Sequence, residues 1–284
     1  MANQKRIAAI HDISGIGKCS LTVAIPIISA VGVETAVIPT AVLSTHTGGF
    51  KNFTYRDLTS DMLPIAEQWK SNRFHFDAIY SGFLGSTEQV EIVGKIFDIL
   101  KSDDTIIMVD PAMADNGRLY KTFAPDFPKK MAELAKSADI LTPNITEACL
   151  MTDMPYSPGP YTKPFIDELI RKVADLGCGR VVLTGVYFDE KSLGAATYNS
   201  DTDIVNYIFS EKQKGFYPGT GDVFASSLLG AIMNGFTLEN AVKVAVDYVR
   251  LCIIETNKMD DPITYGVNFE SVLPNYIQTV KGIK

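Results

Sequence analysis

The segment Pro218-Gly219-Thr220-Gly221-Asp222 follows a β-like region and opens an apolar run from Val223 to Leu229. Its two glycines allow a tight turn in which successive N–H groups point into one small volume, and the start of a helix adds positive potential there. Beside this anion hole, the Asp222 carboxylate could accept a proton from a hydroxyl during phosphoryl transfer. Taken alone, these residues fit equally a tight turn followed by a favourable acid in the first helical turn.

Upstream of this turn, short apolar and β-branched runs alternate with longer segments of helical periodicity. Strands that alternate with helices predict βαβ units and a mostly parallel sheet with helices on both faces. The predicted strands are Arg6–His11, Glu34–Pro39, Asp77–Tyr80, Thr105–Val109, Asp139–Leu141 and Arg180–Thr184.

Two further runs, Leu193–Tyr198 and Ile204–Ile208, are separated by turn residues and predict an antiparallel hairpin beside the sheet. A helix-rich tail is expected from Thr220 onward, and the Pro-rich segment Met154–Pro164 predicts an exposed, mobile loop. The sequence contains neither internal repeats nor linker-like stretches, so residues 1–284 are predicted to form one domain.

The charge distribution excludes several classes of partner. The 26 basic and 33 acidic residues are spread without long runs of one sign, which argues against binding to nucleic acid or an anionic membrane. The short apolar run before Asp12 favours a first strand over a signal peptide. The four cysteines are far apart in the sequence, which favours reduced thiols in the cytoplasm over disulfides or structural zinc.

Five segments together resemble a known family. Asp110–Met113 follows one predicted strand, Thr142–Glu147 follows the next, and Gly219–Asp222 comes near the end of the chain. In this order and spacing they resemble the ribokinase-like superfamily. Ser44–Gly48 and Tyr80–Gly85 resemble its pyridoxal/pyridoxamine kinase branch in particular. The resemblance covers essentially the whole chain and implies a three-layer α/β/α ribokinase-like fold with the active site at the carboxyl ends of the parallel strands.

The resemblance also implies an activity. The expected reaction is ATP-dependent phosphorylation of the 5′-hydroxymethyl group of pyridoxal, pyridoxine or pyridoxamine, with Mg²⁺ accompanying ATP and K⁺ as a candidate additional ion. The expected partners are these small molecules, without nucleic acid or membrane, and the resemblance implies a cytoplasmic homodimer.

The resemblance assigns catalytic roles to matching residues. Asp222 would be the base, and the N–H groups of Gly219–Gly221 would form the anion hole. Asn144 and Glu147 match an Asn-x-x-Glu motif that helps to place Mg²⁺ and the nucleotide phosphates, largely through water. Their spacing of three puts both on one helix face, but the same spacing also predicts a capping box, and both roles can coexist.

Four further residues match positions near the nucleotide. Asp110 and Asp115 correspond to acids that border the phosphates and the metal, and Asp110 is a candidate metal ligand together with Glu147. The Asn-Gly pair after Asp115 predicts a turn, which is the simpler interpretation of that acid. Thr142 and Thr184 match positions near the phosphates or a monovalent cation, although β-branched residues at strand ends are equally expected for structural reasons.

The substrate-binding residues leave alternatives open. Thr47 matches a residue that contacts the ring hydroxyl of the vitamin, whereas Asp12 replaces a common Ser and Phe83 replaces a frequent Tyr. An Asp at position 12 also resembles hydroxymethylpyrimidine kinases of thiamine synthesis, which often carry Cys where this chain has Asp222. A non-catalytic B6-binding protein is the other alternative, but a binder has no need for a base beside an anion hole.

Overall fold

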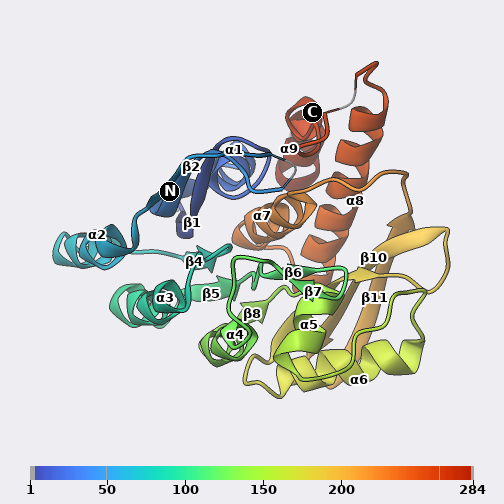
Figure 1. The fold of residues 1–284 in the computed structure, drawn as a ribbon, viewed down its shortest axis with the longest axis horizontal. Helices are drawn as coiled ribbons and strands as arrows, with labels where there is room; N and C mark the ends of the chain where they lie inside the picture. The colour runs from blue at the N-terminus through green and yellow to red at the C-terminus, as the bar shows by residue number, and fades with distance from the viewer. Residues whose placement is uncertain (1–3, 49, 262, 283–284) are drawn as a thin grey trace.

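The computed structural model describes residues 4–48, 50–261 and 263–282. Its largest sheet consists of β1 (Arg6–Ile16), β2 (Glu34–Thr45), β3 (Tyr55–Asp57), β4 (Ala78–Ser81), β5 (Ile106–Val109), β8 (Ile140–Leu141), β9 (Arg180–Val186), β10 (Ser192–Asn199) and β11 (Ile204–Glu211). These nine strands lie in the order β11-β10-β9-β8-β5-β4-β1-β2-β3. Helices lie on both faces of the sheet, which confirms the predicted three-layer α/β/α fold (Figure 1).

The direction of the strands determines at which edge of the sheet their carboxyl ends meet. The six strands from β9 through β8, β5, β4 and β1 to β2 are parallel, and β10 and β11 add the predicted antiparallel hairpin. The chain passes from β1 to β2 on one side and then returns to β4 on the other side of β1. In open parallel sheets, ligands bind at the carboxyl edge beside such a reversal.

Each face of the sheet is covered by its own hydrophobic core, because the central strands are apolar on both faces. One layer contains α2 (Thr59–Ser71), α3 (Thr87–Leu100), α4 (Phe127–Ala135), α5 (Ile145–Met151) and α6 (Lys163–Ala174). The other layer contains α1 (Leu21–Ala30), α7 (Thr220–Met233), α8 (Leu238–Asn257) and, after a 3₁₀ turn at Glu270–Val272, α9 (Leu273–Lys281). Segments from the beginning and the end of the described chain therefore share one layer (Figure 1).

Several predicted boundaries were wrong. β1 and β2 continue past His11 and Pro39, because Ile13–Ile16 keeps pairing with β2 despite its polar residues and glycine. The register shifts between His11 and Ile13, so Asp12 lies at an irregularity of the strand. Bulges of this kind re-aim side chains beside active sites. α6 begins at Lys163, so the last two residues of the predicted Pro-rich loop are helical.

The structure contains three short strands that the sequence did not predict. β3 pairs antiparallel with the extended end of β2. β6 (Ala114–Asp115) and β7 (Arg118–Leu119) form a separate two-stranded sheet. The turn between them has positive φ at Asn116 and Gly117, as the hairpin-forming Asn-Gly pair requires. The predicted turn after Asp115 is therefore confirmed.

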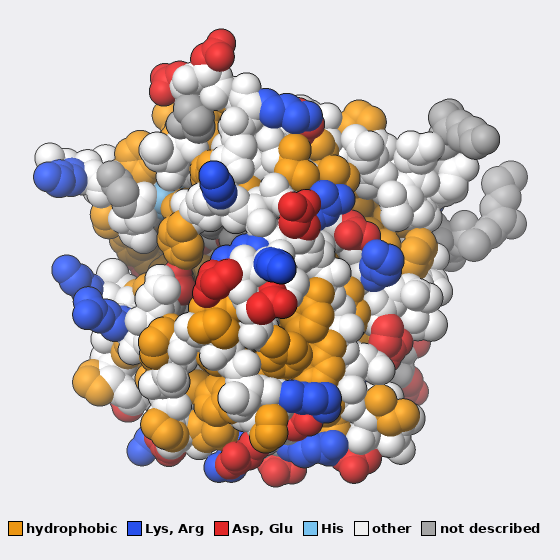
Figure 2. All heavy atoms as spheres, turned by 90° about the vertical axis from the view of Figure 1, so that its right-hand side faces the viewer, with side chains coloured by type: hydrophobic (Ala, Val, Ile, Leu, Met, Phe, Trp, Pro, Cys, Tyr) orange, Lys and Arg blue, Asp and Glu red, His pale blue; other side chains and the backbone are white. Residues whose placement is uncertain are grey.

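On the side shown in Figure 2, which includes α8 and the β10–β11 hairpin, basic and acidic side chains are interspersed. Within the described ranges, every helix is too short or too polar to cross a bilayer.

Gln89 joins the loops at one end of the sheet. Its side chain is fully buried, and its amide nitrogen donates to the Thr40 carbonyl at 3.0 Å and to the Thr59 hydroxyl at 2.9 Å. Its amide oxygen accepts the backbone N–H of Gly85 at 2.7 Å. One side chain thus links β2, the start of α2 and the turn after β4.

We expect Gln89→Met to lower the free energy of unfolding by about 1–3 kcal/mol, because it leaves the part-buried Gly85 N–H without its acceptor and removes the buried donor to the Thr40 carbonyl, which keeps only the Leu58 N–H. Urea unfolding of the variant measures this change. Gln68→Met is the matched control, since Gln68 is exposed on α2. Equal stability of the two variants would contradict the linking role of Gln89.

Candidate functional site

The carboxyl ends of the parallel strands and the beginning of α7 bring most of the predicted site residues to one edge of the fold. Asp12 lies in β1, Asp110 directly follows β5, and Thr184 lies in β9. Asn144 begins α5 just after β8, and Asp222 lies in the first turn of α7. The edge is therefore built from residues far apart in the sequence.

The turn before α7 depends on Gly219. This residue has φ 76°, in the left-handed region that favours glycine, and a Cβ atom there would overlap the carbonyl oxygen of Lys18. The first N–H groups of a helix have no partner within the helix. Thr220 and Gly221 are partly or fully exposed, so the beginning of α7 is open to a ligand.

Asp222 occupies an electrostatically unusual position. Burial raises the pKa of its carboxyl group to about 7. The backbone N–H of Ser20 opposes this rise in pKa, and the nearby negative charge of Asp12 adds to it. Perturbed carboxyl groups of this kind concentrate at functional sites, and a base with a pKa near neutrality suits proton transfer.

Asp110 and Glu147 form a second pair of buried acids, with exposed fractions of 7% and 3%. Burial raises the pKa of Asp110 well above its usual range, and the negative charges of Glu147 and Asp222 raise it further. Burial also raises the pKa of Glu147, to about 8. Three carboxyl groups thus repel one another in a region that is poor in water, and a proton or a cation would relieve that repulsion.

The capping role predicted for Asn144 and Glu147 is confirmed. The Asn144 side chain accepts the N–H of Glu147 at 2.9 Å, and Glu147 accepts the N–H of Asn144 at 2.8 Å. Glu147 also accepts the N–H of Met113 at 3.1 Å, and the Asn144 amide donates to the Ala114 carbonyl at 2.9 Å. The pair therefore fixes the segment after Asp110 as well as the start of α5.

The remaining predicted nucleotide-side residues border this region. Asp115 is half-buried and accepts the N–H of Asn116 at 2.9 Å, and its charge raises the pKa of Glu147. Thr142 is buried and directs its hydroxyl to the Val109 carbonyl at 3.5 Å. Thr184 forms a bridge with Asn144, so it lies beside the capping box.

The predicted substrate-side residues are less closely grouped. Asp12 is buried and accepts hydroxyl hydrogen bonds from Ser20 at 2.5 Å and from Ser14 at 3.0 Å. Thr47 is exposed just beyond β2, and the half-buried Phe83 packs against Phe123 with ring centroids 5.5 Å apart. The hydrogen bonds of Asp12 bring it to the α7 side of the site.

Sequence reasoning missed Lys18, Ser20 and Tyr80. Lys18 forms an ion pair with Glu270 and places its carbonyl against Gly219. Tyr80 is fully buried, and the charges of Asp110 and Asp222 help raise its pKa. The polar residue Ser20, directly before an apolar helix, was a visible signal, but it predicts an ordinary helix cap.

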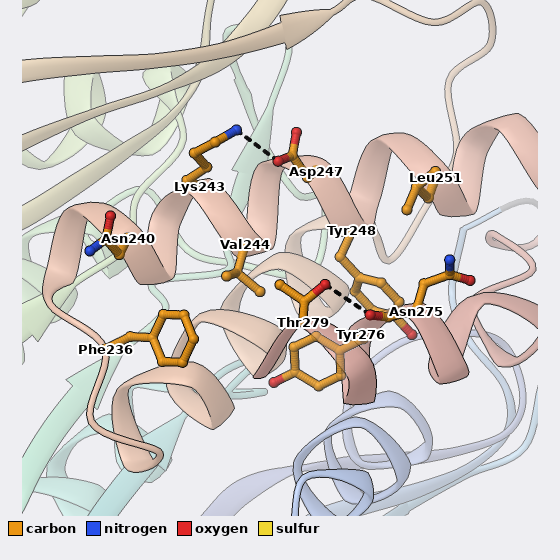
Figure 3. A pocket seen from close by; sticks show the side chains of 10 residues that line it. All are labelled: Phe236, Asn240, Lys243, Val244, Asp247, Tyr248, Leu251, Asn275, Tyr276 and Thr279. Atoms are coloured by element: carbon orange, nitrogen blue, oxygen red, sulfur yellow. Dashed lines mark hydrogen bonds and ion pairs between the residues drawn. The ribbon is translucent and has the colours of Figure 1, made fainter. Parts of the chain in front are cut away.

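The hollow in Figure 3 lies elsewhere. It lies between α8 and α9. Lys243 pairs there with Asp247 at 2.9 Å, and the Thr279 hydroxyl donates to the backbone carbonyl of Asn275. It contains none of the predicted site residues. Across the described part of the chain, no three His, Cys, Asp or Glu side chains gather in a metal-binding arrangement.

Comparison with curated proteins identifies kinases as relatives. The chain is 25% identical over 252 residues to pyridoxine/pyridoxal/pyridoxamine kinase of Bordetella avium (strain 197N), covering 82% of this chain and 79% of that protein. It is 27% identical over 172 residues to pyridoxal kinase of Dictyostelium discoideum, and this match spans about half of either chain, 55% and 54%.

Solved structures show the same fold. A crystal structure named "putative phosphomethylpyrimidine kinase" from Bacteroides thetaiotaomicron VPI-5482, in a crystal form with pyridoxal, matches with TM-score 0.91 and 37% identity over 96% of both chains. Pyridoxal kinase from Lactobacillus plantarum matches with TM-score 0.87 and 26% identity over 97% of both chains. The resemblance predicted from the five segments is confirmed.

The family described as phosphomethylpyrimidine kinase matches residues 24–264, which include the carboxyl edge from Asp110 to Asp222. Since this match extends over most of the sequence and the solved structures agree with it, the chain belongs to the phosphomethylpyrimidine kinase family.

Proposed function

We propose that the protein transfers the γ-phosphoryl group of ATP to the 5′-hydroxymethyl group of a B6 vitamer. The observation that carries this proposal is the position of Asp222, in the first turn of α7 beside the Gly219–Gly221 turn. Asp110 and Glu147 are close enough to influence one another's charge, and Asp222 acts on Asp110. The printed names of the relatives and the pyridoxal crystal form support the choice of substrate.

In this mechanism, Asp222 accepts the hydroxyl proton as the substrate oxygen attacks the γ-phosphorus, and ADP leaves. The N–H groups at the start of α7 bind the phosphoryl oxygens and stabilise their developing charge. Phosphoryl transfer needs little covalent chemistry from the protein, so positioning and charge stabilisation supply most of the rate. We propose that residues 1–284 form one kinase domain, because β1 and β11 lie in one sheet and α1 shares a hydrophobic core with α7, α8 and α9.

The acids on the nucleotide side fit a divalent cation. Asp110 and Glu147 offer the hard oxygen donors that Mg²⁺ prefers, and their mutual repulsion would fall in its presence. Both oxygens of Glu147 already accept backbone N–H groups, so contact through water suits this residue better than direct ligation. Bound together with ATP, Mg²⁺ would neutralise part of the phosphate charge.

Hydroxymethylpyrimidine kinase is the second candidate function, favoured by the description of the matching family. ADP release with pyridoxal, pyridoxamine, hydroxymethylpyrimidine and ribose as acceptors, each measured in K⁺ and in Na⁺, separates the candidates. We expect turnover to be fastest with a B6 vitamer. Turnover only with hydroxymethylpyrimidine would transfer the proposal to that substrate, and absence of turnover with every acceptor would favour a binding protein.

We expect Asp222→Asn to lower kcat by about 10²–10⁴-fold, because the amide keeps the shape but cannot accept the proton. Affinity for ATP, measured by calorimetric titration, should change little. A variant with wild-type kcat, under conditions where chemistry limits turnover, would remove Asp222 from the role of base.

For the anion hole, we expect Gly219→Ala to lower kcat by about 10²-fold or more, because the turn must move away from the Lys18 carbonyl. Strain at φ 76° should also lower stability by about 1–2 kcal/mol. Gly221→Ala is the folding control, since a Cβ there meets no atom within 4 Å, and it should melt like the wild type. Wild-type turnover in Gly219→Ala would contradict the anion hole.

Glu147→Gln should raise the Mg²⁺ concentration for half-maximal activity, because it removes a negative charge beside Asp110. It should also lower thermal stability, since its amide nitrogen must face a backbone N–H. Thr162→Ala is the control, because it removes a cap from α6, away from the proposed metal site. If both variants lose stability and neither changes the Mg²⁺ dependence, Glu147 acts only as a cap.

A further inference from the structure

Lys18 lies between the turn before α7 and the segment that joins α8 to α9. Its side chain is only 18% exposed, which is unusual for a lysine. On the α7 side, a Cβ atom on Gly219 would overlap the Lys18 carbonyl oxygen, so this carbonyl touches the turn directly. On the other side, the Lys18 N–H donates to the carbonyl of Tyr265 at 3.3 Å. The backbone of one residue thus connects the turn before α7 to the segment after α8.

The segment also fits closely around the Lys18 side chain. Gly266 faces the apolar stem, since a Cβ atom on Gly266 would overlap the Cβ of Lys18. Its φ of 151° is a conformation that residues with a side chain rarely adopt, so glycine is favoured there for two reasons. The Lys18 ammonium group forms an ion pair with Glu270 and lies 5.1 Å from the centre of the Phe269 ring. The stem and the charge of Lys18 are therefore both held by residues 265–270.

This segment is itself anchored to α8. The hydroxyl of Tyr248 donates to the Phe269 carbonyl at 3.0 Å, and the hydroxyl oxygen of Thr256 accepts the N–H of Asn268 at 2.7 Å. Tyr248, Thr256 and Phe269 are each at most 2% exposed. Because α8 also packs against α7, the segment forms a fixed wall on the far side of Lys18 from the turn.

Stability alone does not account for this arrangement. Glu270 is 52% exposed, and ion pairs with an exposed partner add little to the stability of a protein. The geometric effect is larger, because the first N–H groups of α7 directly follow Gly219, and a shift of the Lys18 carbonyl would change where they point. Small displacements of such donors are costly to catalysis.

We propose that Lys18 is a positioning residue for the anion hole: the segment Tyr265–Glu270 holds its side chain, so that its carbonyl keeps the turn before α7 in place. The inference rests on the proposed function of that turn in phosphoryl transfer. It gives the segment between α8 and α9 a role in the reaction without any contact with ATP or with the acceptor.

Substitutions at Lys18 test the side chain. Lys18→Ala removes what the segment holds, so we expect kcat to fall about tenfold with the KM values within about threefold, because an anion hole acts on the transition state. Lys18→Arg keeps the charge and a long stem, so kcat should stay within about threefold of wild type. Lys243→Ala is the matched control, since Lys243 forms an ion pair with Asp247 on α8, away from the site, and it should keep wild-type kcat.

Gly266→Ala tests the same contact from the side of the segment and removes no charged group. The added Cβ must push Lys18 away, so we expect kcat to fall about tenfold at a temperature where the variant is folded. Gly235→Ala is its control, because Gly235 has φ 88° but a Cβ there meets no atom within 4 Å. Both variants should lose stability through backbone strain, and only Gly266→Ala should lose kcat.

Other results would overturn the proposal. Wild-type kcat in either Lys18→Ala or Gly266→Ala would show that the segment does not position the turn. A higher KM for ATP with unchanged kcat in Lys18→Ala would show that the ammonium group binds phosphate directly. Equal loss of kcat in Gly266→Ala and Gly235→Ala would assign the loss to general destabilisation.

A second measurement does not depend on activity. The ¹H–¹⁵N signals of residues 219–221 report on the position of the turn, so they should move in Lys18→Ala and Gly266→Ala and keep their positions in Lys243→Ala and Gly235→Ala. Unmoved signals in the first two variants would overturn the positioning role even in an active kinase. If the signals move but the wild-type protein yields ADP with no acceptor, the positioning contact stands and the proposed reaction fails.

Discussion

The contact between the Lys18 carbonyl and Gly219 is the constraint on which the site depends. It presses the loop after the first strand against the beginning of α7, and it leaves no space for a side chain at position 219. The loop leads from β1 to α1, which packs against α7, so this contact joins two segments about two hundred residues apart. The geometry of Asp222 and of the neighbouring N–H groups follows from this contact, so the first turn of α7 cannot move independently of the loop after β1.

Electrostatics adds a cost that the fold must offset. Asp110, Glu147 and Asp222 are held in surroundings that raise the pKa of each, and Asp12 raises the pKa of Asp222 further. Backbone N–H groups reduce this cost at Glu147 and Asp222 without neutralising the charges. A group of carboxyl groups with raised pKa values beside the open start of α7 suits a ligand that brings cations and phosphates together. A cation would favour the ionised carboxylates, and the first N–H groups of the helix can bind phosphate oxygens.

The sequence predicted the layers, the parallel strands and the edge at which the acids meet, because apolar periodicity and the order of motifs depend on local composition. It did not predict β3 or the extensions of β1 and β2, since strands rich in polar residues are stabilised by pairing that composition does not reveal. Asn144 and Glu147 were correctly predicted as a capping box because both partners lie within one turn. The contacts of Lys18 with Gly219 and Glu270 could not be predicted, because each joins residues separated by most of the chain.

The departures from local rules are themselves informative. Three helices away from the site, α3, α6 and α8, begin conventionally, with Ser86, Thr162 and Thr237 each accepting an N–H of the first turn. At the carboxyl edge α5 keeps its capping box, whereas Ser20, before α1, has strained backbone and caps no N–H, and Gly219, before α7, lies in the left-handed region. His11, next to Asp12, is fully buried, and burial lowers its pKa to about 3, so it remains neutral beneath the site. Proteins tolerate such conflicts where function requires them, and the conflict at Ser20 lies in the turn that packs against the start of α7.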